Sequence, residues 1–458
     1  MDARLLSAVL ITRAAWGRRD TWSVDHLKEH QDQALTALRT HAYSRSRFYR
    51  RHHAGLTQAP LEQLPPVTKG DIMAEWDEVV TEPGVRLSDV ERHLRLLTEC
   101  QGDPGTPWRG RWWAAATGGT TGRRGVFVWG RREWASVLAS YARANDWAGV
   151  PVGLTKPLTM AVVSSRNPTH QSALVGASLA SRLVPTLRLD AITPMAEQIR
   201  ALNDFGPRLL VGYPSALRSL AGAQLAGALT ISPQTVMAAS ELLTRSAAQI
   251  MTEAWGVAPY DVYAATETAG IASPCTFRTR HLYEDLLVVD PVDDAGRPVA
   301  PGAAGARLWV SVLSSRALPL IRYEMSDCVA LGGRGCPCGR PFRAVEAIEG
   351  RAEDVLAMAA PAGTAPIHPN VFHDVLDAVA LSGWQVRQVS ASALTLLLAG
   401  PGRSLALEEL TAQVAAAVQA AGAARPAVTA HVVEAIPRTR LGKAPLVVAI
   451  TTGASSSA

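Results

Sequence analysis

Thr117-Gly118-Gly119-Thr120-Thr121-Gly122-Arg123-Arg124-Gly125 is the stretch around which this sequence is organised. Its flanks, residues 111–116 and 126–129, are apolar and predict two short strands joined by a hairpin-like loop. Glycine lets backbone N–H groups turn toward one point, threonine adds hydroxyl donors, and arginine adds fixed positive charge. The loop therefore suits a polyphosphate, although a surface glycine turn has the same local composition.

The composition narrows the class of protein. A chain of 458 residues with 48% hydrophobic and 19% charged residues predicts a folded protein of two or three domains. A net charge of only +5 without a dense Lys/Arg run argues against nucleic-acid binding and suits an anionic substrate. The apolar run at 5–11 predicts an amphipathic helix, and no stretch reaches the ~20 apolar residues of a membrane span. We expect a cytoplasmic protein without a membrane partner, and a homodimer is left open.

Between residues 126 and 263 strand patterns alternate with helix patterns. This alternation predicts a largely parallel sheet with helices on both faces, whose ligands collect at the carboxyl ends of the strands. Strands are predicted at 158–165, 208–212, 235–239 and 260–263. Helices are predicted at 134–147, 172–181, 194–205 with Asp190 or Thr193 as its cap, 214–223, and 245–255 with Thr244 as its cap.

The pattern changes twice further along the chain. Residues 286–289, 307–313 and 318–322 predict an antiparallel, barrel-like subdomain. After Gly350, a helix at 405–421 capped by Ser404 lies among strands at 385–389, 394–398 and 428–433. The predicted fold is α/β: a large N-terminal domain, 1–350, with mostly parallel sheets plus the antiparallel subdomain, and a small, mobile α+β C-terminal domain, 351–458.

Two motifs follow predicted strands and carry carboxylates. Thr266 and Glu267 can meet a phosphate and hold Mg²⁺ on a nucleotide, or simply cap a helix. Asp327 can accept both hydroxyls of a ribose, or form an Asx turn.

Two further motifs lie in the last third of the chain. Residues 348–354 combine a glycine with charged side chains where the folding pattern changes, which indicates a hinge or a plain linker. Residues 437–444 form a basic loop in which Lys443 is either a mobile catalytic cation or part of a solvated tail.

In this order behind a Gly/Thr loop, the four motifs resemble those of the adenylate-forming superfamily over residues 60–450. The segments 207–215 and 239–241 bring the chain closest to the phenylacetate–CoA ligase branch. The resemblance implies that an aromatic carboxylic acid is activated by ATP to an acyl-adenylate with release of pyrophosphate. The acyl group is then transferred to CoA. A carrier-protein thiol, an amine or another nucleophile is the alternative acceptor. A nucleotide-binding regulatory protein is disfavoured because Lys443 and Glu267 are both present.

The resemblance also implies roles for individual residues. The β- and γ-phosphates are held by Thr117, Gly119, Thr120, Thr121 and Gly122. The nucleotide is bound by Thr266 at the α-phosphate, Glu267 through Mg²⁺, Ser240, Glu241 and Tyr263 at the adenine, and Asp327 and Arg351 at the ribose. Lys443 bridges the ribose, the carboxylate and the α-phosphate, and Glu353 is the hinge. The acyl pocket is formed by Tyr213, Ala264, Ala265, Ala269, Gly270 and His170, the last of which is otherwise a surface histidine.

The chain departs from the branch at several positions. Arg123 replaces a lysine, Ala264 and Ser326 replace glycines, and Glu353 replaces the usual hinge aspartate. The segment 357–370 lacks the arginine–glycine pattern that guides the CoA arm in the family. This absence leaves the identity of the acyl acceptor open, but it does not bear on the predicted adenylation step.

The cysteines suggest a metal site. Cys275 and His281, together with Cys336-Pro337-Cys338, supply four ligands for a closed tetrahedral Zn²⁺ site of the structural kind, and related ligases carry a similar set. Scattered core cysteines are the alternative. The remaining Cys100 and Cys328 are expected to be buried thiols.

Overall fold

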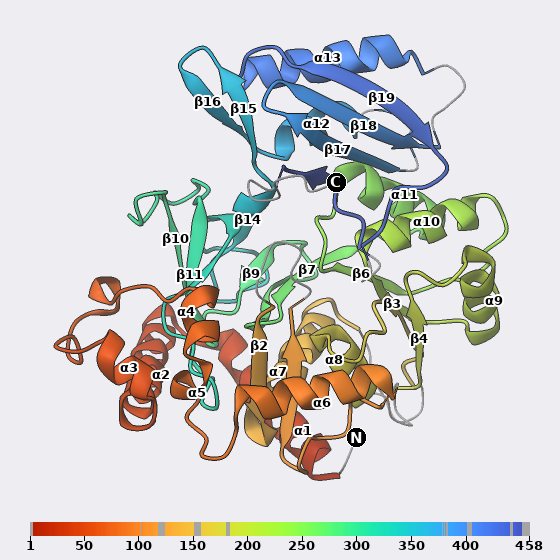
Figure 1. The fold of residues 1–458 in the computed structure, drawn as a ribbon. Helices are drawn as coiled ribbons and strands as arrows, with labels where there is room; N and C mark the ends of the chain where they lie inside the picture. Colours follow the sequence, from red (N-terminus) through yellow and green to blue (C-terminus); the bar gives the residue numbers. More distant parts are fainter. Residues whose placement is uncertain are drawn as a thin grey trace.

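The computed structural model describes residues 3–100, 102–117, 124–150, 157–179, 184–377, 379, 381, 383–400, 405–439 and 443–450. They form a mixed α/β structure in which a seven-stranded sheet is accompanied by smaller, mostly antiparallel sheets (Figure 1). In this part of the chain, no helix is both long and apolar enough to cross a membrane.

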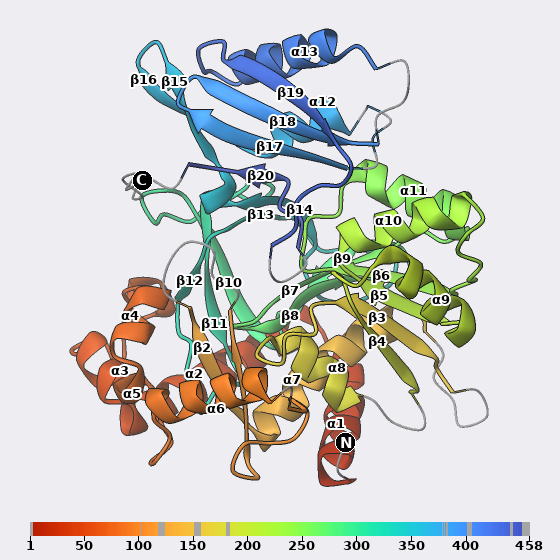
Figure 2. The same ribbon diagram turned by 45° about the vertical axis from the view of Figure 1, so that its right-hand side comes forward.

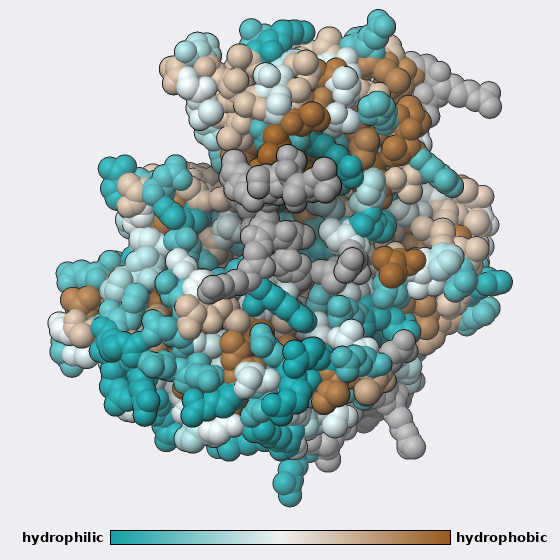
Figure 3. Space-filling view, viewed as in Figure 1, coloured by the Kyte–Doolittle hydropathy of each residue, from teal (hydrophilic) through white to brown (hydrophobic). Residues whose placement is uncertain are grey.

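The N-terminal helices lie at the lower left of Figure 1, where Figure 3 shows a largely hydrophilic surface. They pack around the predicted hairpin, whose strands β1 (Trp112–Ala116) and β2 (Val126–Gly130) pair antiparallel. Thr68 and Asp71 form a capping box at α4, which fixes where this helix begins. The helices are α1 (Ala3–Gly17), η1 (Arg18–Thr21), α2 (Val24–Arg45), α3 (Arg47–His52), η2 (Leu61–Gln63), α4 (Lys69–Ala74), α5 (Trp76–Val79) and α6 (Leu87–Glu99).

The seven-stranded sheet has the order β4-β3-β5-β6-β7-β8-β9, and its β4 to β7 pair in parallel as predicted. β8 and β9 add to one edge antiparallel. The edge strand β4 was not predicted, because its side chains are only half-buried and lack the apolar run of a central strand. The strands are β3 (Met160–Ser164), β4 (Thr186–Asp190), β5 (Leu209–Gly212), β6 (Thr235–Ala239), β7 (Tyr260–Ala265), β8 (Ala269–Pro274) and β9 (Arg280–Leu282).

Helices cover both faces of this sheet. One face packs against α9 (Met195–Phe205), α10 (Pro214–Leu225) and α11 (Arg245–Trp255), and the other faces α7 (Arg131–Trp147) and α8 (Gln171–Leu179). Thr244 caps α11 as predicted by accepting the Ala247 N–H. The predicted caps of α9 are wrong: Pro194 is its N-cap residue and no side chain caps it.

A second group of strands is antiparallel. β10 (Leu287–Val292), β11 (Arg307–Val312) and β12 (Tyr323–Met325) form one sheet, and β13 (Asp327–Leu331) and β14 (Val345–Arg351) form another. The strand predicted at 318–322 is wrong. Pro319 cannot donate a ladder hydrogen bond and Arg322 has a positive φ of 49°, so the extended strand begins only at Tyr323.

The C-terminal segment has its own hydrophobic core, built on residues such as Phe372, Trp384 and Leu396. Figure 2 shows its sheet, of order β19-β18-β17-β20, above the rest of the molecule, with β14 leading toward it. The predicted helix is present, but it follows Ala406 without a side-chain cap, and Ser404 lies outside the described residues. The elements are η3 (Ala352–Asp354), β15 (Leu356–Ala360), β16 (Gly363–Ile367), α12 (Asn370–Leu376), β17 (Gly383–Ser390), β18 (Ala393–Ala399), α13 (Leu407–Ala420), β19 (Ala427–Val433) and β20 (Val447–Val448). The domain boundary at 350/351 and the mobility of this segment remain predictions.

Candidate active site

A cavity of about 610 Å³ lies at the carboxyl ends of β3, β5, β6 and β7. This is the edge at which ligands collect in parallel sheets. Segments far apart in the sequence meet around it, including most of the predicted polar residues. The members of that set that line the cavity are Thr117, Ser240, Thr266, Glu267, Asp327, Arg351 and Lys443.

The base of the Gly/Thr loop is closed by a reciprocal pair of hydrogen bonds. The Thr117 N–H donates to the Gly125 carbonyl at 2.8 Å, and the Gly125 N–H donates to Thr117 Oγ1 at 2.9 Å. Arg124, near the end of the loop, donates to Thr169 Oγ1, and burial lowers the pKa of its guanidinium. The two ends of the loop are thereby fixed beside the cavity. The predicted phosphate-binding residues between them, Gly119, Thr120, Thr121 and Gly122, lie outside the described residues.

Glu267 lies in the turn that joins β7 to β8. Its Oε1 is 3.5 Å from the Tyr323 hydroxyl, and the Thr266 carbonyl accepts a 2.9 Å hydrogen bond from the Gln171 side chain. Burial raises the pKa of Glu267, because a carboxylate removed from water loses its hydration. A cation in the cavity would offset that cost, so this carboxylate fits the Mg²⁺ that accompanies a nucleotide.

Asp327 and Arg351 face each other across β13 and β14. The Arg351 Nε lies 3.6 Å from Asp327 Oδ1, and the two residues are register partners. Asp327 is buried and Arg351 is half-exposed, so the arginine holds the carboxylate at the cavity wall from the solvent side.

Lys443 projects into the same cavity from the C-terminal loop. Its Nζ lies 5.8 Å from the centroid of the Tyr213 ring. Burial and the neighbouring Arg351 lower its pKa, while the charges of Glu241, Glu267 and Asp327 act in the opposite direction. The structure therefore places an amine between an arginine and carboxylates, where its charge can act with little screening by water.

Of the three predicted adenine-binding residues, only one lines the cavity. Ser240 lines the cavity with a positive φ of 73°, which is a strained backbone conformation for a residue with a side chain. Glu241 and Tyr263 do not line it. The Glu241 carboxylate accepts the Ser215 N–H at 3.0 Å and the Ala444 N–H at 2.9 Å, so it connects α10 to the Lys443 loop. Tyr263 is buried, and burial together with Asp327 raises its pKa well above the usual value.

Four of the residues predicted for the acyl pocket line the cavity: Tyr213, Ala264, Ala265 and His170. Burial, with Lys443 and Arg124 nearby, lowers the pKa of His170 to about 4, so its imidazole is neutral at physiological pH.

The other two residues predicted for the acyl pocket, Ala269 and Gly270, do not line the large cavity. Both lie in β8 after the chain has reversed direction, and Gly270 packs against Tyr283 and Ser140. They border a separate small void beside Glu267 and not the large cavity.

Sequence reasoning also missed polar residues that line the cavity. Lys69 comes from the start of α4, and its position was signalled only by the Thr68–Asp71 capping box. Gln171 comes from the start of α8 and accepts a 3.0 Å hydrogen bond from the Tyr141 hydroxyl. Neither has a local pattern that distinguishes it from a surface residue. The side chain of Glu353, the predicted hinge in η3, is not described.

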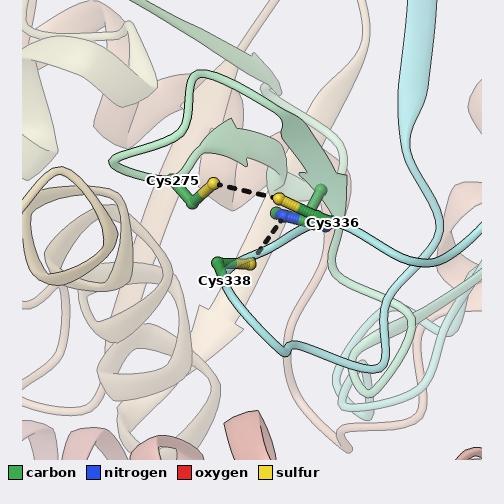
Figure 4. A group of neighbouring side chains, drawn as sticks. Cys275, Cys336 and Cys338 are labelled. Atoms are coloured by element: carbon green, nitrogen blue, oxygen red, sulfur yellow. Dashed lines mark hydrogen bonds between the residues drawn. The ribbon is translucent and has the colours of Figure 1, made fainter.

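The predicted metal ligands Cys275, His281, Cys336 and Cys338 come together, and their ligand atoms all lie within 4.8 Å of one another. Figure 4 shows the three cysteines of this group. Cys275 Sγ is 3.7 Å from Cys336 Sγ, and Cys338 Sγ is 3.2 Å from His281 Nε2. The other ring nitrogen, His281 Nδ1, lies 3.2 Å from the Phe342 carbonyl, which directs Nε2 toward the sulfurs. Three sulfurs and one imidazole nitrogen, with the other ring nitrogen held by the Phe342 carbonyl, fit tetrahedral Zn²⁺.

The two remaining cysteines differ in their exposure to solvent. Cys328 is buried as expected, but Cys100 is exposed, because it follows the last residue of α6 at the surface.

Comparison with known proteins places the chain among related sequences. No protein-family model matches it. It is 25% identical over 368 residues to a phenylacetate-coenzyme A ligase of Pseudomonas putida, with 75% of each chain covered. It is 27% identical over 167 residues to a phenylacetate-coenzyme A ligase of Thermus thermophilus, and this match spans 35% of the chain and 37% of that protein.

Solved structures share the fold. A 2-hydroxyisobutyryl-CoA ligase in the postadenylation state superposes with a TM-score of 0.75 at 19% identity, covering 95% of this chain and 92% of that one. The same ligase in the thioesterification state gives a TM-score of 0.60 with the same coverage.

Proposed function

We propose that the chain is an AMP-forming acid–CoA ligase of the adenylate-forming superfamily, because its sequence is similar to phenylacetate–coenzyme A ligases and it shares the fold of a 2-hydroxyisobutyryl-CoA ligase. It converts a carboxylic acid and ATP into an acyl-adenylate and pyrophosphate, and then transfers the acyl group to the CoA thiol. The proposal covers the aromatic acids that the resemblance implies and other apolar acids. The observation that carries it is the convergence of Lys443, Glu267, Asp327 and Arg351 on one cavity.

In the first step the carboxylate oxygen attacks the α-phosphorus of ATP. A bond forms between that oxygen and phosphorus, and the bond from phosphorus to the β-phosphate oxygen breaks. Lys443 spreads positive charge over the carboxylate and α-phosphate oxygens as negative charge develops there. The step requires positioning more than covalent catalysis, and the strand-end loops supply that positioning.

The surrounding residues orient the nucleotide. Thr266 meets the α-phosphate and Asp327, held by Arg351, accepts the ribose hydroxyls. Mg²⁺ bound at Glu267 would neutralise charge on the phosphate oxygens. The leaving pyrophosphate lies at the Gly/Thr loop, whose base is tied by Thr117.

In the second step the thiolate sulfur of CoA attacks the acyl carbonyl carbon. The carbon–oxygen bond to the phosphate breaks, and AMP leaves with the bonding electrons. The thiol proton passes to solvent.

Exchange of labelled pyrophosphate into ATP, measured over a panel of carboxylic acids, tests adenylation directly. We expect exchange that depends on both an acid and Mg²⁺. Absence of exchange with every acid would refute the proposal. Exchange without formation of an acyl-CoA would retain adenylation and assign a different acceptor, such as a carrier-protein thiol or an amine.

We also propose that the Cys/His cluster, defined as Cys275, His281, Cys336 and Cys338, holds a structural Zn²⁺. Four protein ligands leave no open position for substrate or water, so the ion's contribution is to stability. This is supported by the mutual proximity of the four ligand atoms, which lie within 4.8 Å of one another, and by the three cysteines gathered in Figure 4.

A further inference from the structure

The cavity extends well past the residues that the nucleotide chemistry uses, along one face of the parallel sheet. Alternate residues of β3, β5, β6 and β7 face it, as the two-residue period of a strand requires. Those in the deeper part are Met160, Val162, Val211, Met237 and Val262. The residues between them, such as Ala161, Val163 and Leu210, pack on the other face against α9, α10 and α11.

A helix forms the opposite wall of this deep part. Val175, Gly176 and Leu179 of α8 line the cavity, at the three- and four-residue spacing that puts them on one side of the helix. Ala144 and Asn145 of α7 complete the described wall. The deep part is thus enclosed between the sheet and two helices.

The polar groups of the cavity are gathered at its mouth. The Tyr141 hydroxyl donates to Gln171, and Gln171 donates to the Thr266 carbonyl, so these groups already have partners. Among the described residues deeper than Ser164, Asn145 is the one amide in an otherwise apolar wall. Such a wall holds water poorly and gains free energy when apolar surface replaces water.

The depth of this part follows from the strand geometry. Ser164, at the carboxyl end of β3, and Met160, at its beginning, both line the cavity. Four residues at a rise of about 3.3 Å correspond to a path of ~13 Å. A path of this length is longer than a single phenyl ring. It leads along the face of the sheet away from the carboxyl ends of the strands, the edge at which Thr266 and the activated carboxylate are placed.

We propose that the acid is an extended apolar carboxylic acid, such as a medium-chain alkanoic acid, whose chain lies between the sheet and α8. The inference rests on the proposed adenylation and specifies its substrate. The carboxylate sits near Lys443, and the chain runs from Ala264 toward Met160.

Pyrophosphate exchange with straight-chain acids from butanoate to dodecanoate, and with phenylacetate, tests the proposal. We expect kcat/KM to rise roughly fourfold with each methylene until the deep part is filled, because each buried methylene contributes a similar transfer free energy. Decanoate should exceed both butanoate and phenylacetate. A flat profile, or phenylacetate as the best acid, would overturn the inference while leaving adenylation intact. No exchange with any acid would refute the proposed function and this inference with it.

Variants at the far end of the cavity provide a second, independent test of where the acyl chain binds. Leu179→Trp, or the milder Val175→Phe, should reduce kcat/KM for decanoate by about tenfold while butanoate stays within about twofold. The matched control is Leu225→Trp, which makes the same change at the last residue of α10, at an exposed position outside the cavity. An equal loss for both acids in the α8 variants would contradict the assignment of the deep part to the acyl chain.

Discussion

The Cys/His cluster and the large cavity at the strand ends both gather side chains, but they differ in how those side chains are arranged. Each gathers side chains from distant segments of the chain. In the cluster the four groups lie against one another, with Cys275 and His281 fully buried, and leave room for one ion. In the cavity Lys443, Glu267 and Asp327 line an open space of about 610 Å³. Groups that satisfy one another stabilise a fold, whereas groups held apart around a space are available to a substrate.

The two regions are also connected. Cys275 follows β8, the strand entered from the Glu267 turn, and Cys336 and Cys338 lie in the segment between β13 and β14. Asp327 and Arg351 stand at the outer ends of those two strands. The cluster therefore lies where the segments that present the acidic residues of the cavity meet, and a Zn²⁺ bound there would tie these segments together.

The sharpest test of the cavity is Lys443→Ala. Because the amine is placed where negative charge develops, we expect adenylation to fall by about 10²–10³-fold while ATP binding stays within about twofold. Pyrophosphate exchange and equilibrium ATP binding measure the two quantities. Lys28→Ala, at an exposed position on α2, is the control. Unchanged exchange in the Lys443 variant would remove the role assigned to this residue.

The corresponding test of the cluster is Cys336→Ser. We expect about one zinc per chain in the parent protein, little in the variant, and a loss of unfolding free energy above about 4 kcal/mol, as for removal of other metal sites. Elemental analysis and denaturant unfolding are the measurements. Cys100→Ser changes an exposed thiol outside the cluster and should leave both unchanged. A metal-free parent of full stability would exclude the zinc site.

Glu241 tests whether the Lys443 loop is held in place from outside the cavity. Glu241→Gln keeps the shape but replaces one acceptor oxygen with a donor, so a bond from the Ser215 or Ala444 N–H is lost. We expect adenylation to fall about tenfold, the value of one hydrogen bond to a charged group, with unchanged ATP affinity. Thioester formation from a presynthesised adenylate should be unaffected. The exposed Glu253→Gln on α11 is the control, and equal losses in both half-reactions would contradict the positioning role.

The last test concerns the pH dependence of stability. His170 has a folded pKa of about 4, below the unfolded value of about 6.5, so the unfolded chain binds more protons between these values. Its contribution to stability is present above pH ~6.5 and is lost as the pH falls toward 4, by at most about 1.4 kcal/mol per unit. His170→Gln should flatten this dependence in denaturant unfolding measured across that window. His431→Gln, exposed on β19, should not, and an unchanged slope in the His170 variant would contradict the burial of a neutral imidazole.

Much of the local structure followed from the sequence alone. The hairpin around the Gly/Thr loop, the parallel strands and the Thr244 cap were predicted because each depends on residues close together in the chain. The predictions failed where side chains are only half-buried, as in β4, or where one residue breaks an apolar run, as Arg322 does before β12.

The same distinction between local and long-range structure applies to the candidate site. The sequence determined which groups exist, in which order, and that most of them follow strands. The residues singled out in this way do meet in the structure: Thr266, Asp327 and Lys443 line one cavity, and the four cysteine and histidine ligands lie close to one another. Periodicity and spacing encode these features because they report on hydrogen bonds and burial within a few residues.

Only the tertiary structure decided what each group faces. It turned the Glu241 carboxylate toward the backbone N–H groups of Ser215 and Ala444, and it placed Ala269 and Gly270 after the β7–β8 turn, outside the large cavity. The packing of β3 and α8 also leaves an apolar space between them, which no local sequence pattern predicts. These outcomes depend on how sheets and helices separated by tens to hundreds of residues pack together, and the free energy of that packing is not contained in any one segment.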